Sequence, residues 1–228
     1  MSEHRVYSVA IDGPAGAGKS TVAKLAAEAL GFCYVDTGAI YRSVGYHMDF
    51  YGIGPKDTDG ITRLIGDVNL DITYDSAGNQ RMILNGRDIS DEIRTPRMSQ
   101  IASVISAQPV VREFLLEMQR EIARKKNVIM DGRDIGTVVL PHADVKIFLT
   151  ASAEVRAQRR MLELEAKGQK TDRNRVLQEI LQRDEQDRTR KIAPLAQAKD
   201  AILLDSSEWS REETVAAVLS TIRERIAV

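Results

Sequence analysis

The residues with the clearest chemical meaning lie near the N-terminus, where positions 13–20 read GPAGAGKS. A glycine, four residues and then Gly-Lys-Ser form the G-x-x-x-x-G-K-[ST] pattern that binds nucleotide phosphates. Flexible glycines cost conformational entropy on folding, so a run of them needs a compensating gain. Here Gly13, Gly16 and Gly18 let backbone N–H groups curl around a β-phosphate. The pattern predicts a nucleotide site, without saying which group accepts the phosphate.

The side chains that follow the glycines suit the same task. Lys19 can reach the β- and γ-phosphates, Ser20 can offer its hydroxyl to Mg²⁺, and Thr21 can contact the α-phosphate. The apolar run 6–11 before the loop predicts a buried strand, and residues 21–31 after it predict a helix. The positive N-terminal end of such a helix attracts phosphate. Strand, glycine loop and helix together are the context that this motif requires.

A second group, Asp36-Thr37-Gly38 with Arg42, lies at the expected start of another helix. Asp36 or Thr37 can serve simply as the helix N-cap, and for Asp36 this reading is as well supported as a binding role. Arg42 lies one turn into that helix, where its positive charge opposes the helix dipole. The arginine is better explained if a phosphate occupies the gap.

A third group, DGRD at 131–134, ends a predicted strand. It can be read as a solvated turn. Yet two carboxylates beside an arginine, at the ligand-binding edge of a sheet, can hold a Mg²⁺-bound water, a phosphate and a base edge. Ser103 and Arg112 form a fourth candidate group in a helical pair, although Ser103 taken alone reads as a surface residue.

Arginines are concentrated between residues 153 and 190, in two predicted polar helices. One explanation is a pair of solvated helices with i,i+4 ion pairs to the accompanying acidic residues. The alternative, which we favour, is a helical lid that closes over ATP. The arginines of this stretch are Arg156, Arg159, Arg160, Arg173, Arg175, Arg183, Arg188 and Arg190.

Length and composition favour one large domain, with 228 residues, a net charge of −1 and the single cysteine Cys33. The charge gives no reason to expect nucleic acid as a partner, and one cysteine excludes an internal disulfide and fits a reducing compartment. The N-terminal residues do not resemble a signal peptide, and no stretch is apolar for long enough to span a bilayer. We therefore expect a cytoplasmic protein that binds no membrane.

The elements that must position these residues alternate between strand and helix. Buried strands with short loops and intervening helices predict an α/β fold whose mostly parallel sheet is covered on both faces. Ligands in such folds bind at the carboxyl ends of the strands. Besides 6–11, strands are expected at 33–35, 127–131, 145–150 and 201–206, and helices after 36, at 152–168, at 173–189 and after 208.

The pattern changes between the second and third of these strands. Residues 52–60 read as a turn-rich connection and 61–67 as a short helix. VNLDITYD then alternates apolar and polar residues, and Asn85-Gly86 signals a hairpin. We expect a small antiparallel insert over 68–90, followed by two helices that begin near Pro96 and Pro109.

The chain resembles the bacterial cytidylate kinase family from about residue 6 to about residue 215. The glycine loop is shared with many nucleotide-binding proteins, whereas the whole series in this order is specific. The resemblance implies a P-loop NTPase three-layer fold that phosphorylates CMP and dCMP with ATP and Mg²⁺, and analogy with nucleotide kinases suggests a monomer. The segments that carry it are GPAGAGKS, DTGAIYR, ISDEIRTPRMSQIASVISAQPVVR, DGRDIGTVVLPHADVKIFLTASAEVRAQRR and RDEQDRTRKIAPL.

The resemblance also implies roles for individual residues. Catalysis would fall to Lys19, Arg133 and Arg190, with Arg190 on the transferring phosphate. Ser20 and Asp131 would serve Mg²⁺, with Asp36 as the alternative holder of a metal-bound water. ATP would be bound by Gly13, Pro14, Ala15, Gly16, Ala17, Gly18, Lys19, Ser20, Thr21 and Arg159. The acceptor nucleotide would be bound by Thr37, Arg42, Ser103, Arg112, Arg133, Asp134, Arg183, Asp187 and Arg190.

Within that acceptor site, the chemistry of cytosine fits three of the residues. Cytosine presents an amine donor beside two acceptors, so Asp134 can accept from the amine while Arg112 and Ser103 donate to N3 and O2. Uracil would face unmatched polar groups, and such a site can reject a mismatch by up to about 10⁴-fold. Arg42 and Arg133 would bind the acceptor phosphate, and Arg183 and Asp187 the ribose.

The expected organisation is a single kinase domain over 1–228. Its core comprises 1–60, 126–152 and 191–228, the NMP-binding region with its antiparallel insert covers 61–125, and the lid covers 153–190. Other readings are a P-loop kinase for AMP, UMP or shikimate, a GTPase-like switch, or a single-stranded nucleic-acid binder. A GTPase would need an N-K-x-D motif, which the sequence lacks. A single-stranded nucleic-acid binder would need aromatic residues among its basic ones, and the arginine run has none.

Overall fold

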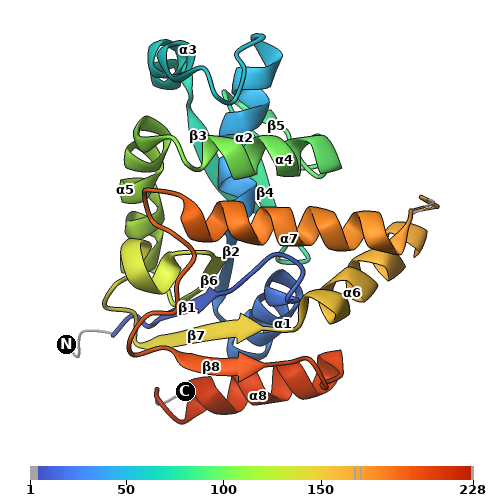
Figure 1. Cartoon of the computed structure of the whole chain (residues 1–228). Helices are drawn as coiled ribbons and strands as arrows, with labels where there is room; N and C mark the ends of the chain where they lie inside the picture. The colour runs from blue at the N-terminus through green and yellow to red at the C-terminus, as the bar shows by residue number, and fades with distance from the viewer. Residues whose placement is uncertain (1–4, 167, 170, 227–228) are drawn as a thin grey trace.

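The computed structural model of the chain describes residues 5–166, 168–169 and 171–226. Its centre is a five-stranded sheet in the order β2–β6–β1–β7–β8, and each neighbouring pair is parallel (Figure 1). This confirms the α/β fold expected from the alternation of strands and helices. The strands are β1 (Ser8–Asp12), β2 (Cys33–Asp36), β6 (Val128–Gly132), β7 (Val145–Thr150) and β8 (Ile202–Asp205).

The two faces of this sheet contribute to two separate hydrophobic cores. Val9 and Ile11 of β1 pack with residues of α1 (Lys19–Leu30) and α8 (Arg211–Arg223). Ala10, between them, packs on the other face with α2 (Thr37–Phe50) and α5 (Pro109–Lys125). Because successive side chains of a strand point to opposite faces, a short apolar run such as SVAID supplies both cores at once. In Figure 1, α8 lies at the bottom of the molecule and α2 and α5 towards the top.

A three-stranded antiparallel sheet forms the insert, as expected. It consists of β3 (Leu70–Tyr74), β4 (Gln80–Leu84) and β5 (Arg87–Asp88), and Asn85 and Gly86 turn the chain with positive φ angles of 49° and 81°. The short helix before it was expected to begin at residue 61, which is wrong. Helix α3 (Thr58–Leu64) begins earlier because Asp57 caps it, accepting from the Gly60 N–H at 2.9 Å, and a 3₁₀ turn covers Ile65–Asp67.

Helices α4 (Pro96–Ile105) and α5 each begin at their expected proline, where a missing N–H costs nothing. Helices α6 (Ala153–Ala166) and α7 (Arg173–Thr189) form an antiparallel pair with a small core of their own, built from Ala157, Val176 and Ile180. Positions 167 and 170, in the connection between them, lie outside the described residues. In Figure 1, α7 extends across the middle of the molecule below α4.

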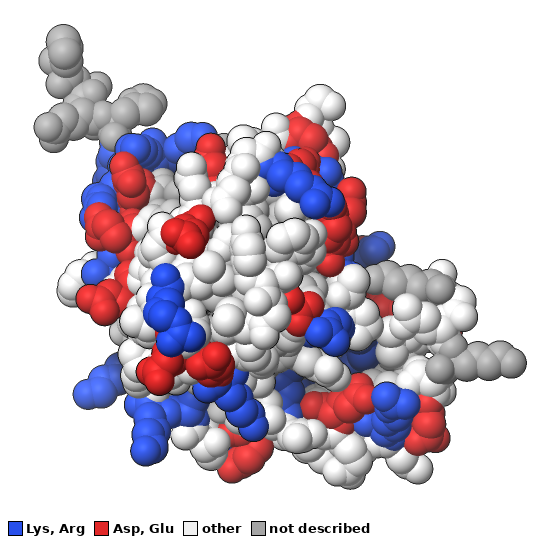
Figure 2. Space-filling view, turned by 90° about the horizontal axis from the view of Figure 1, so that it is seen from above, with Lys and Arg blue, Asp and Glu red and all other residues white. Residues whose placement is uncertain are grey.

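The surface at the top of Figure 1 carries both signs of charge. Basic and acidic side chains are interspersed around an uncharged central area, as Figure 2 shows. Within the described part of the chain, no helix combines the length and the apolar character needed to cross a bilayer.

Candidate active site

A cleft of about 600 Å³ opens at the carboxyl ends of β1, β2 and β6, with α7 on its far side. The glycine loop, the start of α2, α4 and the segment after β6 form its other walls. Most of the residues singled out in the sequence line it, although they are scattered along the chain. They are Ala15, Gly16, Gly18, Lys19, Ser20, Thr21, Thr37, Arg42, Ser103, Asp131, Arg133, Asp134, Arg183, Asp187 and Arg190.

The glycine loop has a backbone that other residues would not tolerate. Gly13, Gly16 and Gly18 have φ angles of 151°, 76° and 84°. A Cβ atom on Gly13 would lie 1.9 Å from the carbonyl oxygen of Leu149, so the strand β7 itself excludes a side chain there. Gly18 is the N-cap of α1 and supplies no capping side chain. The first N–H groups of α1 therefore remain available to an anion.

Lys19, the first residue of α1, lies buried at the centre of this loop. Its side chain is folded back so that Nζ donates to the Pro14 carbonyl oxygen at 2.7 Å. Burial and, after it, the positive charge of Arg133 lower the pKa of Lys19 well below its usual range. The site therefore concentrates positive charge in a region shielded from water. An anionic ligand would offset that charge and favour the protonated lysine.

Ser20 and Asp131 meet on the other side of Lys19. The Ser20 hydroxyl donates to Asp131 Oδ2 at 2.7 Å, and the Tyr34 hydroxyl donates to Oδ1 at 2.9 Å. Burial and the nearby charge of Asp36 raise the pKa of Asp131 to about 6. Among the described residues, no group of three or more His, Cys, Asp or Glu side chains is placed to hold a metal ion. One hydroxyl and one carboxylate fit a Mg²⁺ ion whose other ligands are phosphate oxygens and water.

Asp36, at the start of α2, both caps this helix and contacts Arg42 of the candidate binding group. Its side chain caps the helix by accepting from the Ala39 N–H at 2.9 Å, and it also pairs with Arg42 Nη2 at 2.8 Å. Arg42 Nε is buried and has no partner among the residues that the structure describes. Thr37 donates from its hydroxyl to the backbone oxygen of Asp131 at 2.7 Å, which joins this helix to the end of β6. Capping and a binding role are thus compatible.

Asp134 lies between two arginines from distant parts of the chain. Arg112 of α5 contacts its Oδ2, and Arg190 donates to its Oδ1 at 2.9 Å. The backbone oxygen of Ser106 also accepts from Arg112, at 3.0 Å. Arg190, expected beside the transferring phosphate, is therefore joined to the residues expected to read the base. Ser103 lies in the same cleft, and its buried hydroxyl has no hydrogen-bond partner in the described ranges.

Helix α7 is linked to the end of β6 through another ion pair. Arg133 Nε donates to Asp187 Oδ2 at 2.8 Å. Burial opposes ionisation of Asp187, but the charges of Arg133 and Arg183 outweigh it and lower the pKa of this carboxyl. Burial and the charge of Arg133 lower the pKa of Arg183 to about 10, and its Nε is buried without a partner. Unpaired donors on Arg42, Ser103 and Arg183 make the cleft suited to a polar, anionic ligand.

Arg159 does not line the cleft. Its guanidinium donates to the backbone oxygens of Ser206 and Trp209, at 2.7 and 3.3 Å, beyond the end of β8. Its contact with ATP stays a prediction. Arg156 is the arginine of α6 that touches the glycine loop, since it donates to the Ala15 oxygen at 3.0 Å and pairs with Asp184 at 2.7 Å.

Asp12, the last residue of β1, belongs to the site although it was not predicted from the sequence. Its buried carboxylate accepts from the Ile135 N–H at 2.8 Å and the Gly136 N–H at 2.7 Å. These bonds fix a π-helical turn, Ile135–Val139, directly after the DGRD segment. An aspartate that ends a strand just before a glycine loop was a usable signal, because it lies at the ligand-binding edge of the sheet.

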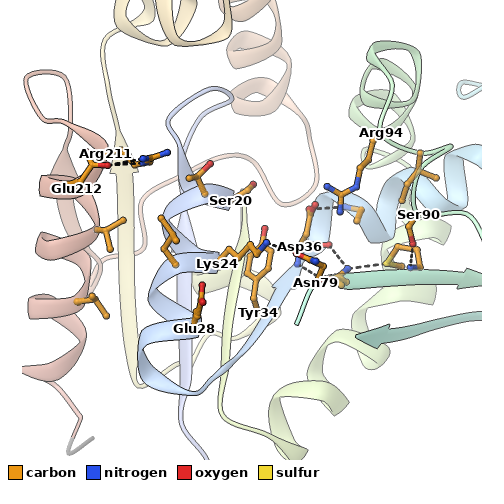
Figure 3. Close-up of a pocket in the computed structure, with 18 of the residues that line it drawn as sticks. Ser20, Lys24, Glu28, Tyr34, Asp36, Asn79, Ser90, Arg94, Arg211 and Glu212 are labelled. Atoms are coloured by element: carbon orange, nitrogen blue, oxygen red, sulfur yellow. Dashed lines mark hydrogen bonds and ion pairs between the residues drawn. The ribbon is translucent and has the colours of Figure 1, made fainter. Parts of the chain in front are cut away.

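A second hollow of about 900 Å³ lies along α1, between α8 and the insert. Figure 3 shows Lys24 and Glu28 of α1 on its floor, Arg211 and Glu212 of α8 on one side and Asn79 on the other. Ser20, Thr21 and Asp36 border both spaces, but none of the expected acceptor-binding arginines lines this one. We therefore take the smaller cleft as the candidate site.

Comparison with known proteins assigns the family. Residues 9–224 match the family model described as "Cytidylate kinase". The cytidylate kinase of Carboxydothermus hydrogenoformans is 51% identical over 214 residues, 94% of this chain and 96% of the relative. That of Caldicellulosiruptor bescii is 50% identical over 212 residues, 93% of each chain. An uncharacterised protein from Eubacterium ventriosum, 12% identical, shares the fold with a TM-score of 0.54 over 96% of this chain and 99% of that one. The chain belongs to the cytidylate kinase family.

Proposed function

We propose that the protein transfers the terminal phosphoryl group of ATP, bound with Mg²⁺, to CMP and dCMP, giving ADP and CDP or dCDP. The observation that carries this proposal is the pairing of two features in one cleft. A glycine loop suited to a triphosphate faces Asp134 and Ser103, which suit a cytosine edge; Arg112, which does not itself line the cleft, pairs with Asp134. Family membership supports the same activity.

The acceptor is proposed to lie between α2, α4 and α7. Arg42 and Arg133 would bind its phosphate, and Arg183 and Asp187 its ribose. Asp134 would accept from the cytosine amine, using lone pairs that its two arginines leave free, while Arg112 and the unpaired Ser103 hydroxyl donate to the ring acceptors. Arg190 would then serve from the Asp134 side of the cleft, close to both the base and the phosphate.

Phosphoryl transfer in such a cleft needs no general base. The attacking group is a phosphate oxygen, which is already ionised near neutral pH, so catalysis depends on alignment and on neutralising charge. Lys19, Arg133 and Arg190 would stabilise the negative charge of the transferring group in a site shielded from water. When bound, Mg²⁺ would neutralise phosphate charge, held by the Ser20 hydroxyl directly and by Asp131 directly or through water.

We further propose the three-part organisation of core, NMP-binding region and lid over 1–60, 61–125, 126–152, 153–190 and 191–228. The Arg133–Asp187 pair and the hydrogen bond from Arg156 to the Ala15 oxygen support a lid role, because they join α7 to the segment after β6 and α6 to the glycine loop. By analogy with nucleotide kinases that have a moving lid, we propose that the protein acts as a monomer. The half-buried free thiol of Cys33 fits the reducing cytoplasm, which we propose as the compartment.

A nucleotide panel tests the proposed function. Purified protein with Mg²⁺ and ATP is given CMP, dCMP, UMP, AMP, GMP or shikimate in turn, and ADP release is followed. We expect turnover with CMP and dCMP and a kcat/KM for UMP lower by about 10²-fold or more, because uracil leaves buried polar groups unmatched. Strong turnover with UMP would keep the kinase but contradict the base-reading roles. Turnover with another acceptor, or with none, would overturn the proposal.

Replacement of Asp131 by asparagine tests the metal assignment. Asparagine keeps an acceptor oxygen for one of the two hydroxyls, that of Ser20 or that of Tyr34, and removes the negative charge. The Mg²⁺ concentration for half-maximal activity should rise about tenfold or more, as is usual when a group that orients a metal is lost. Asp200→Asn is the matched control, since Asp200 pairs with Lys146 at the opposite edge of the sheet. An unchanged Mg²⁺ dependence in Asp131→Asn would remove Asp131 from the metal site.

A further inference from the structure

The antiparallel insert contacts the catalytic core at a defined place, the free edge of β2. This strand is at the edge of the five-stranded sheet and, within the described part of the chain, pairs only with β6. On its other side, the Tyr74 hydroxyl donates to the Tyr34 backbone oxygen at 2.9 Å. The side-chain amide of Gln80 makes two bonds to the Asp36 backbone, accepting from its N–H at 2.8 Å and donating to its oxygen at 3.3 Å. Both residues come from the insert.

Tyr74 and Gln80 are cross-strand partners, at the end of the β3–β4 ladder. Together they satisfy backbone groups that a neighbouring strand would otherwise satisfy. Gln80 is 5% exposed, and its Nε2 lies 3.0 Å from Met82 Sδ, so its orientation is fixed by packing. In Figure 3, Tyr34 and Asp36 lie beside the end of the hairpin marked by Asn79, and Lys24 of α1 points towards Asn79.

Asp36 links the insert to the candidate acceptor site. It is the last residue of β2 and the N-cap of α2, so its backbone sets where that helix begins. Its carboxylate fixes Arg42, and the next residue, Thr37, is bonded to the backbone of Asp131. A shift at Asp36 would therefore move the groups expected around the acceptor phosphate, while the glycine loop follows a different strand, β1.

We propose that Gln80 is a positioning residue for the acceptor nucleotide: the insert fixes the Asp36 backbone through Gln80, and Asp36 in turn fixes Arg42 and Thr37. This inference rests on the proposed function and adds to it. It gives the antiparallel sheet a role in acceptor binding, exerted by one buried amide that does not line the acceptor cleft.

The test separates acceptor binding from ATP binding. Gln80→Met keeps the length of the side chain and removes both hydrogen bonds. The KM for CMP, and the Kd for CMP measured by calorimetry without ATP, should rise about tenfold, because small displacements of binding groups are costly. The KM for ATP should change less than about twofold on the same argument, since the glycine loop is not moved.

Tyr74→Phe is the matched control, because it removes the other contact of the same cross-strand pair without touching Asp36. It should leave the Kd for CMP unchanged, while both variants lower Tm. Gln80→Asn, which keeps the amide on a side chain one methylene shorter, should fall between Gln80→Met and the unmodified protein, and it serves if Gln80→Met does not fold.

The outcomes distinguish this inference from the proposed function. Equal weakening of CMP binding in Tyr74→Phe and Gln80→Met would mean that general docking of the insert matters and would overturn the role of Gln80. An unchanged Kd for CMP in the Gln80 variants would do the same. If the unmodified protein neither binds nor phosphorylates CMP, the proposed function fails instead.

Discussion

Lys19→Ala is expected to lower kcat about a thousandfold, the loss usual when one preorganised charge-stabilising group is removed. The ammonium lies buried among Arg133, Asp131 and the Pro14 carbonyl, where water screens its charge little. Steady-state assays with CMP and ATP give kcat. The Tm of the variant should not fall. Burial and the charge of Arg133 disfavour a charged lysine at this position, so alanine removes an unfavourable contribution to the free energy of folding.

Lys24→Ala provides the control for this variant. Lys24 lies on the same helix, α1, and its Nζ contacts Asn79 at the surface at 2.5 Å. Removing it should change kcat less than about twofold, as is usual for surface substitutions away from a site. A Lys19→Ala enzyme with kcat near that of the unmodified protein would remove the glycine loop from the mechanism. A large loss in Lys24→Ala would show that any change on α1 disturbs the site.

The elements that local chemistry determines were predictable from the sequence. β7 and α7 have the expected bounds, 145–150 and 173–189, because a mostly apolar run interrupted by Lys146 defines the strand and a capping aspartate, Asp172, begins the helix. The start of α3 was misplaced because a run rich in glycine, proline and aspartate reads as a connection. The helix begins at Thr58 because the Asp57 side chain accepts from the Gly60 N–H as an N-cap. Aspartate makes a similar hydrogen bond in turns, so the residue type alone did not distinguish a helix start from a turn.

The glycine loop was predictable because its chemistry is contained in eight consecutive residues. Contacts between distant positions were not. Asp12 and Ile135 are 123 residues apart in the chain, and Asp36 and Gln80 are 44 apart, yet each pair is joined by a hydrogen bond at 2.8 Å. No local pattern marks Gln80, since glutamine on a strand reads as an exposed polar residue until the neighbouring sheet edge is known.

Arg112→Met is expected to abolish the preference for cytosine more than any other single change. Arg112 is buried, contacts Asp134 and Ser106, and lies over the Tyr41 ring with 5.7 Å from Cζ to the ring centroid. Methionine fills much of the same volume but donates nothing. The kcat/KM for CMP should fall about a thousandfold, because a hydrogen-bonding site that loses a donor leaves its partners unmatched. The Kd for ATP should stay within about twofold, since no ATP contact is removed.

The control is Arg120→Met, two turns later on the same helix. Arg120 donates to the backbone oxygens of Val138 and Val139, both at 3.0 Å, whereas Arg112 contacts the carboxylate of Asp134, which lines the cleft. If α5 merely needs an arginine for stability, both variants should lose activity in parallel with Tm. If Arg112 reads the base, only its replacement should bring the kcat/KM values for CMP and UMP close together. Equal loss of CMP and ATP binding in Arg112→Met would contradict the base-reading role, because a contact confined to the acceptor base cannot weaken binding at the glycine loop.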